Sequence, residues 1–112
     1  MNTFQKNNFG ISSRYILLII NELKRFPQIE KTVIFGSRAM GNYKAGSDID
    51  LAIFGKYVDF EVLVRLGAAL NYELPIPYKV DIIHFESLKN QALKNHILKE
   101  GKMLYQKNSE ED

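Results

Sequence analysis

The sequence contains no cysteine and no long run of apolar residues. The absence of cysteine excludes a disulfide framework, a thiolate zinc site and a cysteine nucleophile, and it is typical of proteins in a reducing compartment. The longest apolar stretch, residues 15–20, is far shorter than the roughly 18 to 20 residues that a membrane-spanning helix needs. We therefore expect a cytoplasmic protein that has no membrane partner.

Proline, glycine and net charge are also low. Three prolines and 7 glycines among 112 residues, 46% of them hydrophobic and 25% charged, exclude disordered, collagen-like and low-complexity proteins. The formal net charge of +2 is too small to indicate nucleic acid or an anionic membrane as the partner. A chain of this size has room for one hydrophobic core. We expect one domain over residues 1–112, with a polar N-terminal segment at 1–11 and an acidic tail at 108–112.

Hydrophobic spacing and turn residues predict alternating helices and strands. A helix should start at Ser12 or Ser13 and end at Pro27, and two further helices are expected at 59–72 and 87–100. Runs of β-branched and aromatic residues predict strands at 31–35, 49–54 and 78–85, with a short strand at 103–105. A single helical turn closed by Gly41 should precede a loop at 41–47. The predicted fold class is α/β (α+β), with a small mixed sheet of three to four strands flanked by helices.

The strand predicted at 49–54 places two acidic residues on one surface. Side chains alternate along a strand, so Asp48 and Asp50 project from the same side with their Cα atoms roughly 6.5 to 7 Å apart. Ile49, Leu51 and Ile53 fill the opposite face. This alternation fixes the register, because a shift of one residue would bury both carboxylates.

A third acidic residue, Asp81, lies within an apolar strand, where a charge without a partner is unexpected, and no cationic residue is expected beside it. If the two strands are neighbours, three carboxylates converge. At a separation of about 6 Å and an effective dielectric constant near 20, each pair would repel by roughly 3 kcal/mol. A cluster of oxygen ligands favours magnesium or manganese over zinc, and two such ions suit an in-line displacement at phosphorus.

Gly36 and Ser37 stand where a predicted strand turns into a predicted helix. Free backbone N–H groups and the helix dipole attract phosphate at such a turn, glycine permits close approach, and the Ser37 hydroxyl adds a donor. No Gly-Lys-Ser/Thr sequence follows, so this is not a P-loop. Alone, a Gly-Ser turn or an Asp-x-Asp strand is commonplace, whereas their combination at this spacing indicates a site.

Other polar residues have simpler interpretations. Arg38 either reaches a phosphate or is solvated on a short helix. Lys44 and Lys79 are contacts for a triphosphate or, more simply, ordinary surface charges. His84 and His96 lie in different elements and are better explained by packing or surface positions than as metal ligands.

Together, Gly36-Ser37, ten intervening residues, Asp48-x-Asp50 and the later Asp81 resemble the motif of the minimal nucleotidyltransferases of the DNA polymerase β superfamily. The resemblance extends from about residue 32 to residue 105. It implies the nucleotidyltransferase fold, with two Mg²⁺ ions, or Mn²⁺, bound by three catalytic carboxylates: Asp48, Asp50 and Asp81. It implies nucleotide contacts from four residues: Gly36, Ser37, Arg38 and Ser47.

The resemblance also implies a reaction and a partner. The reaction is transfer of a nucleoside monophosphate, AMP from ATP, to a hydroxyl group, with Asp81 helping to deprotonate the acceptor. Short members of this family are similar to the partners of small helical HEPN-type proteins in toxin–antitoxin pairs, where the transferase adenylylates a tyrosine of the HEPN ribonuclease. A hetero-oligomer with such a protein and an antitoxin role are therefore expected. Larger relatives have a helical acceptor-binding domain for which 112 residues leave no room, so another chain should supply it.

Two alternatives stand beside this interpretation. Many relatives have a basic residue where this chain has Met40, which favours a non-catalytic module that binds nucleotide or a partner and regulates by contact alone. A further alternative is a small-molecule nucleotidyltransferase subunit that needs a separate substrate-binding chain.

Overall fold

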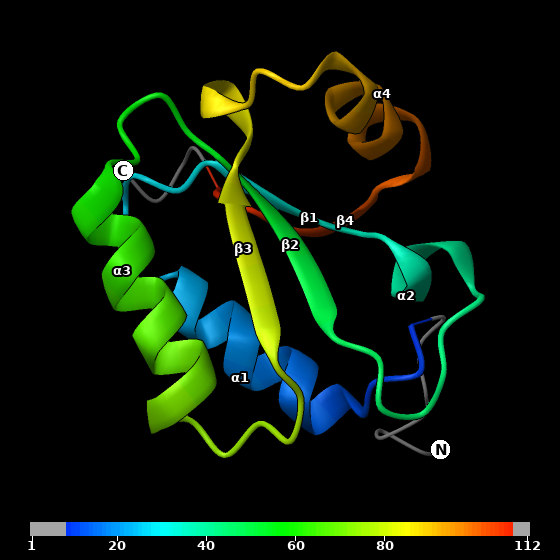
Figure 1. The fold of residues 1–112 in the computed structure, drawn as a ribbon. Coiled ribbons are helices and arrows are strands. Elements are labelled where there is room, and N and C mark those ends of the chain that lie inside the picture. The colour runs from blue at the N-terminus through cyan, green and yellow to red at the C-terminus, as the bar shows by residue number, and fades with distance from the viewer. Residues whose placement is uncertain (1–8, 109–112) are drawn as a thin grey trace.

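A single mixed sheet of four strands organises the computed structural model, which describes residues 9–108 (Figure 1). The strand order is β3-β2-β1-β4. β1 runs antiparallel to both β2 and β4, whereas β2 and β3 are parallel. The bounds are β1 Lys31–Phe35, β2 Ile49–Phe54, β3 Val80–His84 and β4 Lys102–Gln106. The predicted mixed sheet is confirmed, and β1 and β2 have the predicted limits.

Helices cover both faces of the sheet (Figure 1). α1 (Ser13–Leu23) and α3 (Phe60–Ala68), which continues as the π-helix η1 (Ala69–Glu73), lie on one face. α4 (Gln91–Glu100) lies on the other, while α2 (Ser37–Met40) is the predicted single turn after β1. Across residues 9–108, no helix is both long enough and apolar enough to cross a bilayer.

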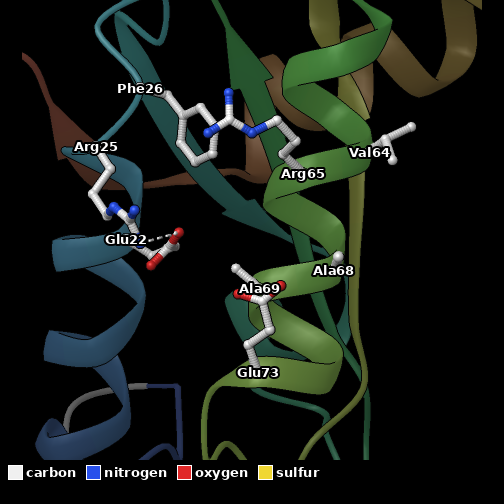
Figure 2. A pocket seen from close by; sticks show the side chains of 8 residues that line it. All are labelled: Glu22, Arg25, Phe26, Val64, Arg65, Ala68, Ala69 and Glu73. Atoms are coloured by element: carbon white, nitrogen blue, oxygen red, sulfur yellow. Dashed lines mark hydrogen bonds and ion pairs between the residues drawn. The ribbon is translucent and has the colours of Figure 1, made fainter.

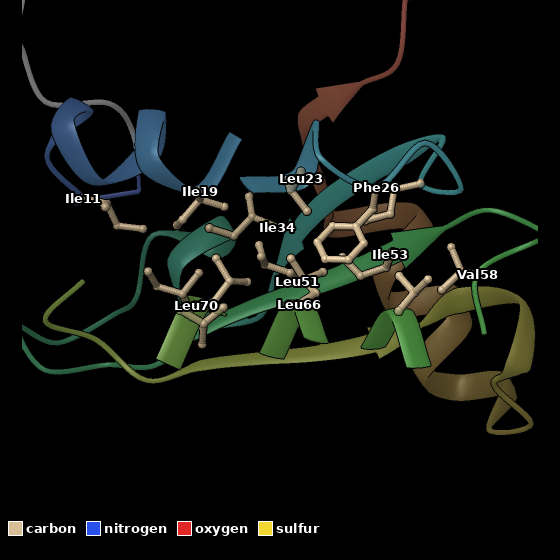
Figure 3. Close-up of a cluster of buried hydrophobic side chains, with 14 residues drawn as sticks. Ile11, Ile19, Leu23, Phe26, Ile34, Leu51, Ile53, Val58, Leu66 and Leu70 are labelled. Carbon is tan, nitrogen blue, oxygen red and sulfur yellow. The ribbon is translucent and has the colours of Figure 1, made fainter. Parts of the chain in front are cut away.

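Strand β2 divides the apolar side chains between the two faces. Ile49, Leu51 and Ile53 belong to the larger buried cluster, which fills the space between the sheet and helices α1 and α3 (Figure 3). Ala52, which points the other way, packs with Ile97 of α4 in a smaller cluster. The alternation predicted for this strand is confirmed, and it directs Asp50 to the face that α4 covers.

Helix α1 starts as predicted but ends earlier. The hydroxyl oxygen of Ser12 accepts a hydrogen bond from the backbone N–H of Arg14 at 3.3 Å, which caps the first turn. The N–H of Phe26 donates to the carbonyl of Leu23 at 3.1 Å. This tighter step closes the last turn at Leu23, so the prediction that Pro27 ends the helix is wrong.

The helix predicted at 87–100 begins later, at Gln91. The Asn90 side chain accepts from the N–H of Leu93 at 3.0 Å and provides the cap. Leu88 has extended backbone angles, φ −69° and ψ 136°, and separates α4 from the short 3-10 helix η2 (Phe85–Ser87). Ser87 still belongs to η2, and Asn90 is the residue that caps α4. The predicted start at Ser87 is therefore wrong.

Candidate active site

The three predicted acidic residues lie where β1 ends and where β2 and β3 begin. Asp50 is paired with Phe35 of β1 on one side and with Asp81 of β3 on the other. Asp48 stands two residues before Asp50 and immediately precedes β2. Because β2 and β3 are parallel, their starting residues meet at the same edge of the sheet. The two acidic strands are neighbours, which is the condition under which the three carboxylates are expected to converge.

The pKa of Asp50 is raised, first by burial and then by the negative charges of Asp81 and Asp48. The three carboxylates therefore share one electrostatic environment, which disfavours a charge on Asp50. Asp81 also has a cationic neighbour, since Lys79 Nζ lies 3.6 Å from its Oδ1. The expectation of no cation beside Asp81 is therefore wrong, although both side chains are exposed and such pairs are weak.

The donor chemistry at this edge fits a hard divalent cation. Asp48, Asp50 and Asp81 offer only carboxylate oxygens, the ligands that magnesium and manganese prefer. A cation would also relieve the repulsion that raises the pKa of Asp50. Within the described part of the chain, no three acidic or histidine side chains are placed so that they could already hold a metal ion together.

Gly36 forms the joint between β1 and α2 directly against Asp50. Its φ of 76° lies in the left-handed region, where residues with a side chain are strained. A Cβ atom at this position would also lie 2.5 Å from Oδ2 of Asp50. Both constraints favour glycine, because a side chain here would be strained and would displace the Asp50 carboxylate. Ser37 begins α2 next to the carboxylates. The two residues of the predicted Gly-Ser turn lie beside the acidic cluster.

Arg38 is buried, which neither interpretation of the sequence specified. Its side chain is only 1% exposed, so it is not solvated on a short helix. Nη1 donates to the carbonyl of Phe9 at 2.9 Å and Nε donates to that of Ser47 at 3.1 Å. Weaker bonds reach the carbonyls of Gly10, at 3.4 Å, and Ala45, at 3.3 Å. The guanidinium is occupied by backbone oxygens, which gives Arg38 a structural role, and its direct contact with nucleotide stays a prediction.

The Arg38 guanidinium also packs against two aromatic rings. Its Cζ is 5.0 Å from the ring centroid of Tyr43 and 4.6 Å from that of Tyr78. Tyr43 belongs to the loop before Asp48, and Tyr78 precedes β3. Cation–π contacts of this kind connect the loop that precedes Asp48 with the segment that precedes Asp81. Sequence reasoning missed this role, and no local motif signals it.

Ser47 shapes the loop that leads into Asp48. Its hydroxyl oxygen accepts from the N–H of Lys44 at 2.8 Å, and its own N–H donates to the Lys44 carbonyl at 3.0 Å. The loop is therefore closed immediately before the acidic pair. A direct contact between Ser47 and nucleotide stays a prediction.

The two histidines take structural positions. His84 Nε2 lies 2.7 Å from the Gly55 carbonyl oxygen, and Nδ1 lies 2.7 Å from the Ser87 hydroxyl. The His96 ring meets Phe35 edge-on, with ring centroids 6.4 Å apart. These contacts agree with the packing interpretation of both residues.

Two hollows of the surface differ in their relation to the carboxylates. One, of about 300 Å³, lies between α1 and α3 and is lined by charges of both signs, among them Glu22, Arg25 and Arg65 (Figure 2). It is on the face of the sheet opposite to Asp50. The other, of about 470 Å³, adjoins the start of β3 and has Asp81 in its lining. The second hollow provides solvent access next to the acidic edge.

Comparisons with known proteins agree with this geometry. The family model "Polymerase beta, Nucleotidyltransferase" matches residues 18–110. MJ0604 of Methanocaldococcus jannaschii, named as a candidate protein adenylyltransferase, is 34% identical over 82 residues, which are 70% of this chain and 80% of that protein. The protein adenylyltransferase MntA of Aphanizomenon flos-aquae is 24% identical over 103 residues, covering 84% of this chain and 68% of that protein.

Solved structures share the fold. A chain of a toxin–antitoxin crystal structure with AMP-PNP superimposes with a TM-score of 0.65 at 22% identity, over 87% of this chain and 75% of that one. A chain from the complex of tri-AMPylated HEPN toxin with MNT antitoxin of Shewanella oneidensis gives a TM-score of 0.64 at 22% identity, over 88% and 76%. The nucleotidyltransferase fold expected from the sequence is confirmed. This chain belongs to the polymerase β nucleotidyltransferase family of enzymes.

Proposed function

We propose that this nucleotidyltransferase moves AMP from ATP to a hydroxyl group of a small helical HEPN-type protein and thereby neutralises that partner's toxicity. The proposal depends on one observation above all: Asp50 and Asp81 face each other on parallel strands beside the Gly36 turn. It is supported by relatives named as protein adenylyltransferases and by fold neighbours from toxin–antitoxin complexes. The chain and its partner would form a hetero-oligomer.

The acidic edge has the groups that such a transfer needs. Asp48, Asp50 and Asp81 would hold two magnesium ions, or manganese, which when bound stabilise negative charge that develops on the phosphates. Gly36 leaves room for a triphosphate to approach the start of α2, where Ser37 adds a hydroxyl donor.

The acceptor reaction then follows from the position of Asp81. This carboxylate lies beside the open hollow at the start of β3, where it accepts the proton of an incoming hydroxyl. The hydroxyl oxygen bonds to the α-phosphorus of ATP, and the bond from that phosphorus to the bridging oxygen of the β-phosphate breaks. Pyrophosphate leaves, and AMP stays on the acceptor.

Label transfer tests the proposal. The protein is incubated with α-labelled ATP, Mg²⁺ and the helical protein that copurifies with it, and the proteins are separated. Asp48→Asn and Asp81→Asn should each lower labelling of the partner by at least about 100-fold, because each removes a charge needed in the transition state. Circular dichroism and partner binding serve as folding controls. Undiminished labelling by either folded variant contradicts the proposal.

A non-catalytic binding module is the second candidate. It is favoured by the ion pair between Lys79 and Asp81, which engages the carboxylate proposed to accept the proton. In that case the same two asparagine variants would bind and neutralise the partner as well as the wild type does. Loss of neutralisation with binding preserved favours the enzyme.

A further inference from the structure

Asn71, a residue outside the nucleotidyltransferase motif, is bonded to the strand that carries Asp81. Its Oδ1 accepts from the backbone N–H of Val80 at 2.8 Å, and its Nδ2 donates to the Val80 carbonyl, also at 2.8 Å. Nδ2 also donates to the carbonyl of Gly67 at 3.0 Å. One carboxamide thus satisfies both backbone groups of the residue immediately before Asp81.

These bonds lie on the outer side of β3. In the described sheet β3 is an edge strand, and its inner side is bonded to β2, where the N–H of Ile49 donates to the carbonyl of Lys79 at 2.9 Å. A neighbouring strand would present one donor and one acceptor to Val80 on the outer side. The Asn71 carboxamide presents the same pair, so the start of β3 is held on both sides, at Lys79 by β2 and at Val80 by Asn71.

The π-helix η1 places Asn71 at this edge. The N–H of Leu74 donates to the carbonyl of Ala69 at 2.9 Å, a step of five residues that widens the helix. Asparagine is a poor residue inside a regular helix, because its side chain competes for backbone groups. Here the side chain bonds to β3 and to the preceding helical turn. The irregular turn therefore connects the helix to the strand that carries Asp81.

The edge strand needs such a restraint. Asp50 and Asp81 stand directly opposite each other, and like charges in opposite positions destabilise strand pairing. Repulsion acts to displace Asp81 from its position opposite Asp50, and Asn71, bonded to the outer side of β3, fixes the backbone of the residue next to Asp81.

We propose that Asn71 is a positioning residue for Asp81: its carboxamide replaces a fifth strand and fixes the backbone from which Asp81 meets the acceptor hydroxyl. The inference rests on the proposed function, since that function defines the role of Asp81. Aspartate has the shape of asparagine but cannot donate to the two carbonyls, and leucine has a similar volume but neither donor nor acceptor. An amide of this length is therefore required.

Asn71→Asp and Asn71→Leu test the role of the amide. AMP transfer to the copurifying helical protein is measured below the melting temperature of each variant. We expect kcat to fall at least tenfold in both, while KM for ATP stays within twofold, because the Gly36 turn is untouched. Hydrogen exchange of the Val80 amide, followed by NMR in the isolated chain, should accelerate at least tenfold in Asn71→Leu, which removes the acceptor of this N–H, and less in Asn71→Asp, which keeps one.

Asn90→Ala is the matched control. It removes another asparagine that bonds a backbone N–H, that of Leu93 in α4, without touching β3. We expect a lower melting temperature with kcat unchanged. The proposal is overturned if Asn90→Ala loses as much kcat as the Asn71 variants do, because the loss is then a general effect of lower stability.

Two further results overturn the proposal. One is a kcat within threefold of the wild type in the Asn71 variants, and the other is unchanged exchange at Val80 in Asn71→Leu. Asp81→Asn, assayed in parallel, separates the two hypotheses. If Asp81→Asn transfers AMP at the wild-type rate, the proposed function fails and the role of Asn71 fails with it. If Asp81→Asn is inactive and the Asn71 variants are fully active, the role of Asn71 alone fails.

Discussion

Asp50 is the carboxylate whose surroundings oppose its ionisation. Burial, Asp81 and Asp48 raise its pKa above the ordinary value of 3.8, so the folded protein binds this proton more tightly than the unfolded chain does. Its contribution to stability is complete below pH 3.8 and is lost as the pH rises through the raised pKa. In the absence of a cation, the ionised Asp50 therefore destabilises the fold at neutral pH.

The first prediction concerns Asp50→Asn, which removes this charge. With EDTA present, the variant should melt a few degrees above the wild type at pH 7, because the cost of burying the charge and the repulsion by Asp81 and Asp48 are both gone. The difference should shrink toward pH 4, as Asp50 of the wild type gains its proton. Thermal melts at the two pH values measure it. A variant less stable than the wild type at pH 7 would contradict the electrostatic account.

The second prediction concerns the buried guanidinium. Arg38→Met should lower the free energy of unfolding by about 3 kcal/mol, because it leaves backbone carbonyls without donors and removes two aromatic contacts. Arg38→Lys should recover only part of the loss, since one ammonium group lacks the planar fork of donors. Urea denaturation measures each change.

Arg14→Met is the matched control, because Arg14 is exposed on α1. Its effect should stay within about 0.5 kcal/mol. Equal losses from the exposed and the buried arginine would contradict the structural role of Arg38.

Some residues of the site can be predicted from the sequence and others cannot, for physical reasons. Asp48 and Asp50 follow from the alternation of one strand, which is a local property. The role of Arg38 depends on carbonyls from the segments at 9–10 and 45–47, which only the folded chain brings together. Asn71 is missed for the same reason, since its partner Val80 is nine residues away in another element.

Among the elements, those with strong local signals are predicted best. The strands at 31–35 and 49–54 have their predicted limits because β-branched and aromatic runs end at turn residues. The π-helix η1 is hidden in a continuous helical pattern, and the place of β4 beside β1 comes from long-range pairing. The start of α4 is misplaced because Ser87 and Asn90 both have the character of a helix cap.

The third prediction concerns the joint between β1 and α2. Gly36→Ala should lower stability by about 1 to 2 kcal/mol, because alanine is strained at this backbone conformation. AMP transfer should also fall at least tenfold, since the new methyl group meets Oδ2 of Asp50. Denaturation and label transfer give the two values.

Gly46→Ala is the control for this joint. A Cβ atom at Gly46 would meet no atom within 4 Å, so stability and transfer should both stay near the wild-type values. Full activity of Gly36→Ala would show that the close approach of Gly36 to Asp50 has no part in catalysis.

On the scale of the whole molecule, the sheet separates the main hydrophobic core from the acidic residues of the candidate site. Most of the core lies between the sheet and helices α1 and α3, whereas Asp50 points to the α4 face. The acidic residues gather at one end of the sheet, beside the hollow at the edge strand β3. A partner that presents a hydroxyl group at this edge can meet the carboxylates without disturbing the main core.

The most direct test of the account is the intact mass of the copurifying helical partner after incubation with the protein, ATP and Mg²⁺. The account predicts a mass increase equal to one or more AMP groups, and it predicts no increase when Asp81→Asn replaces the wild type. An unchanged partner mass with the folded wild-type protein, in a complex that still binds ATP, would contradict the claim that this chain transfers AMP to a protein hydroxyl.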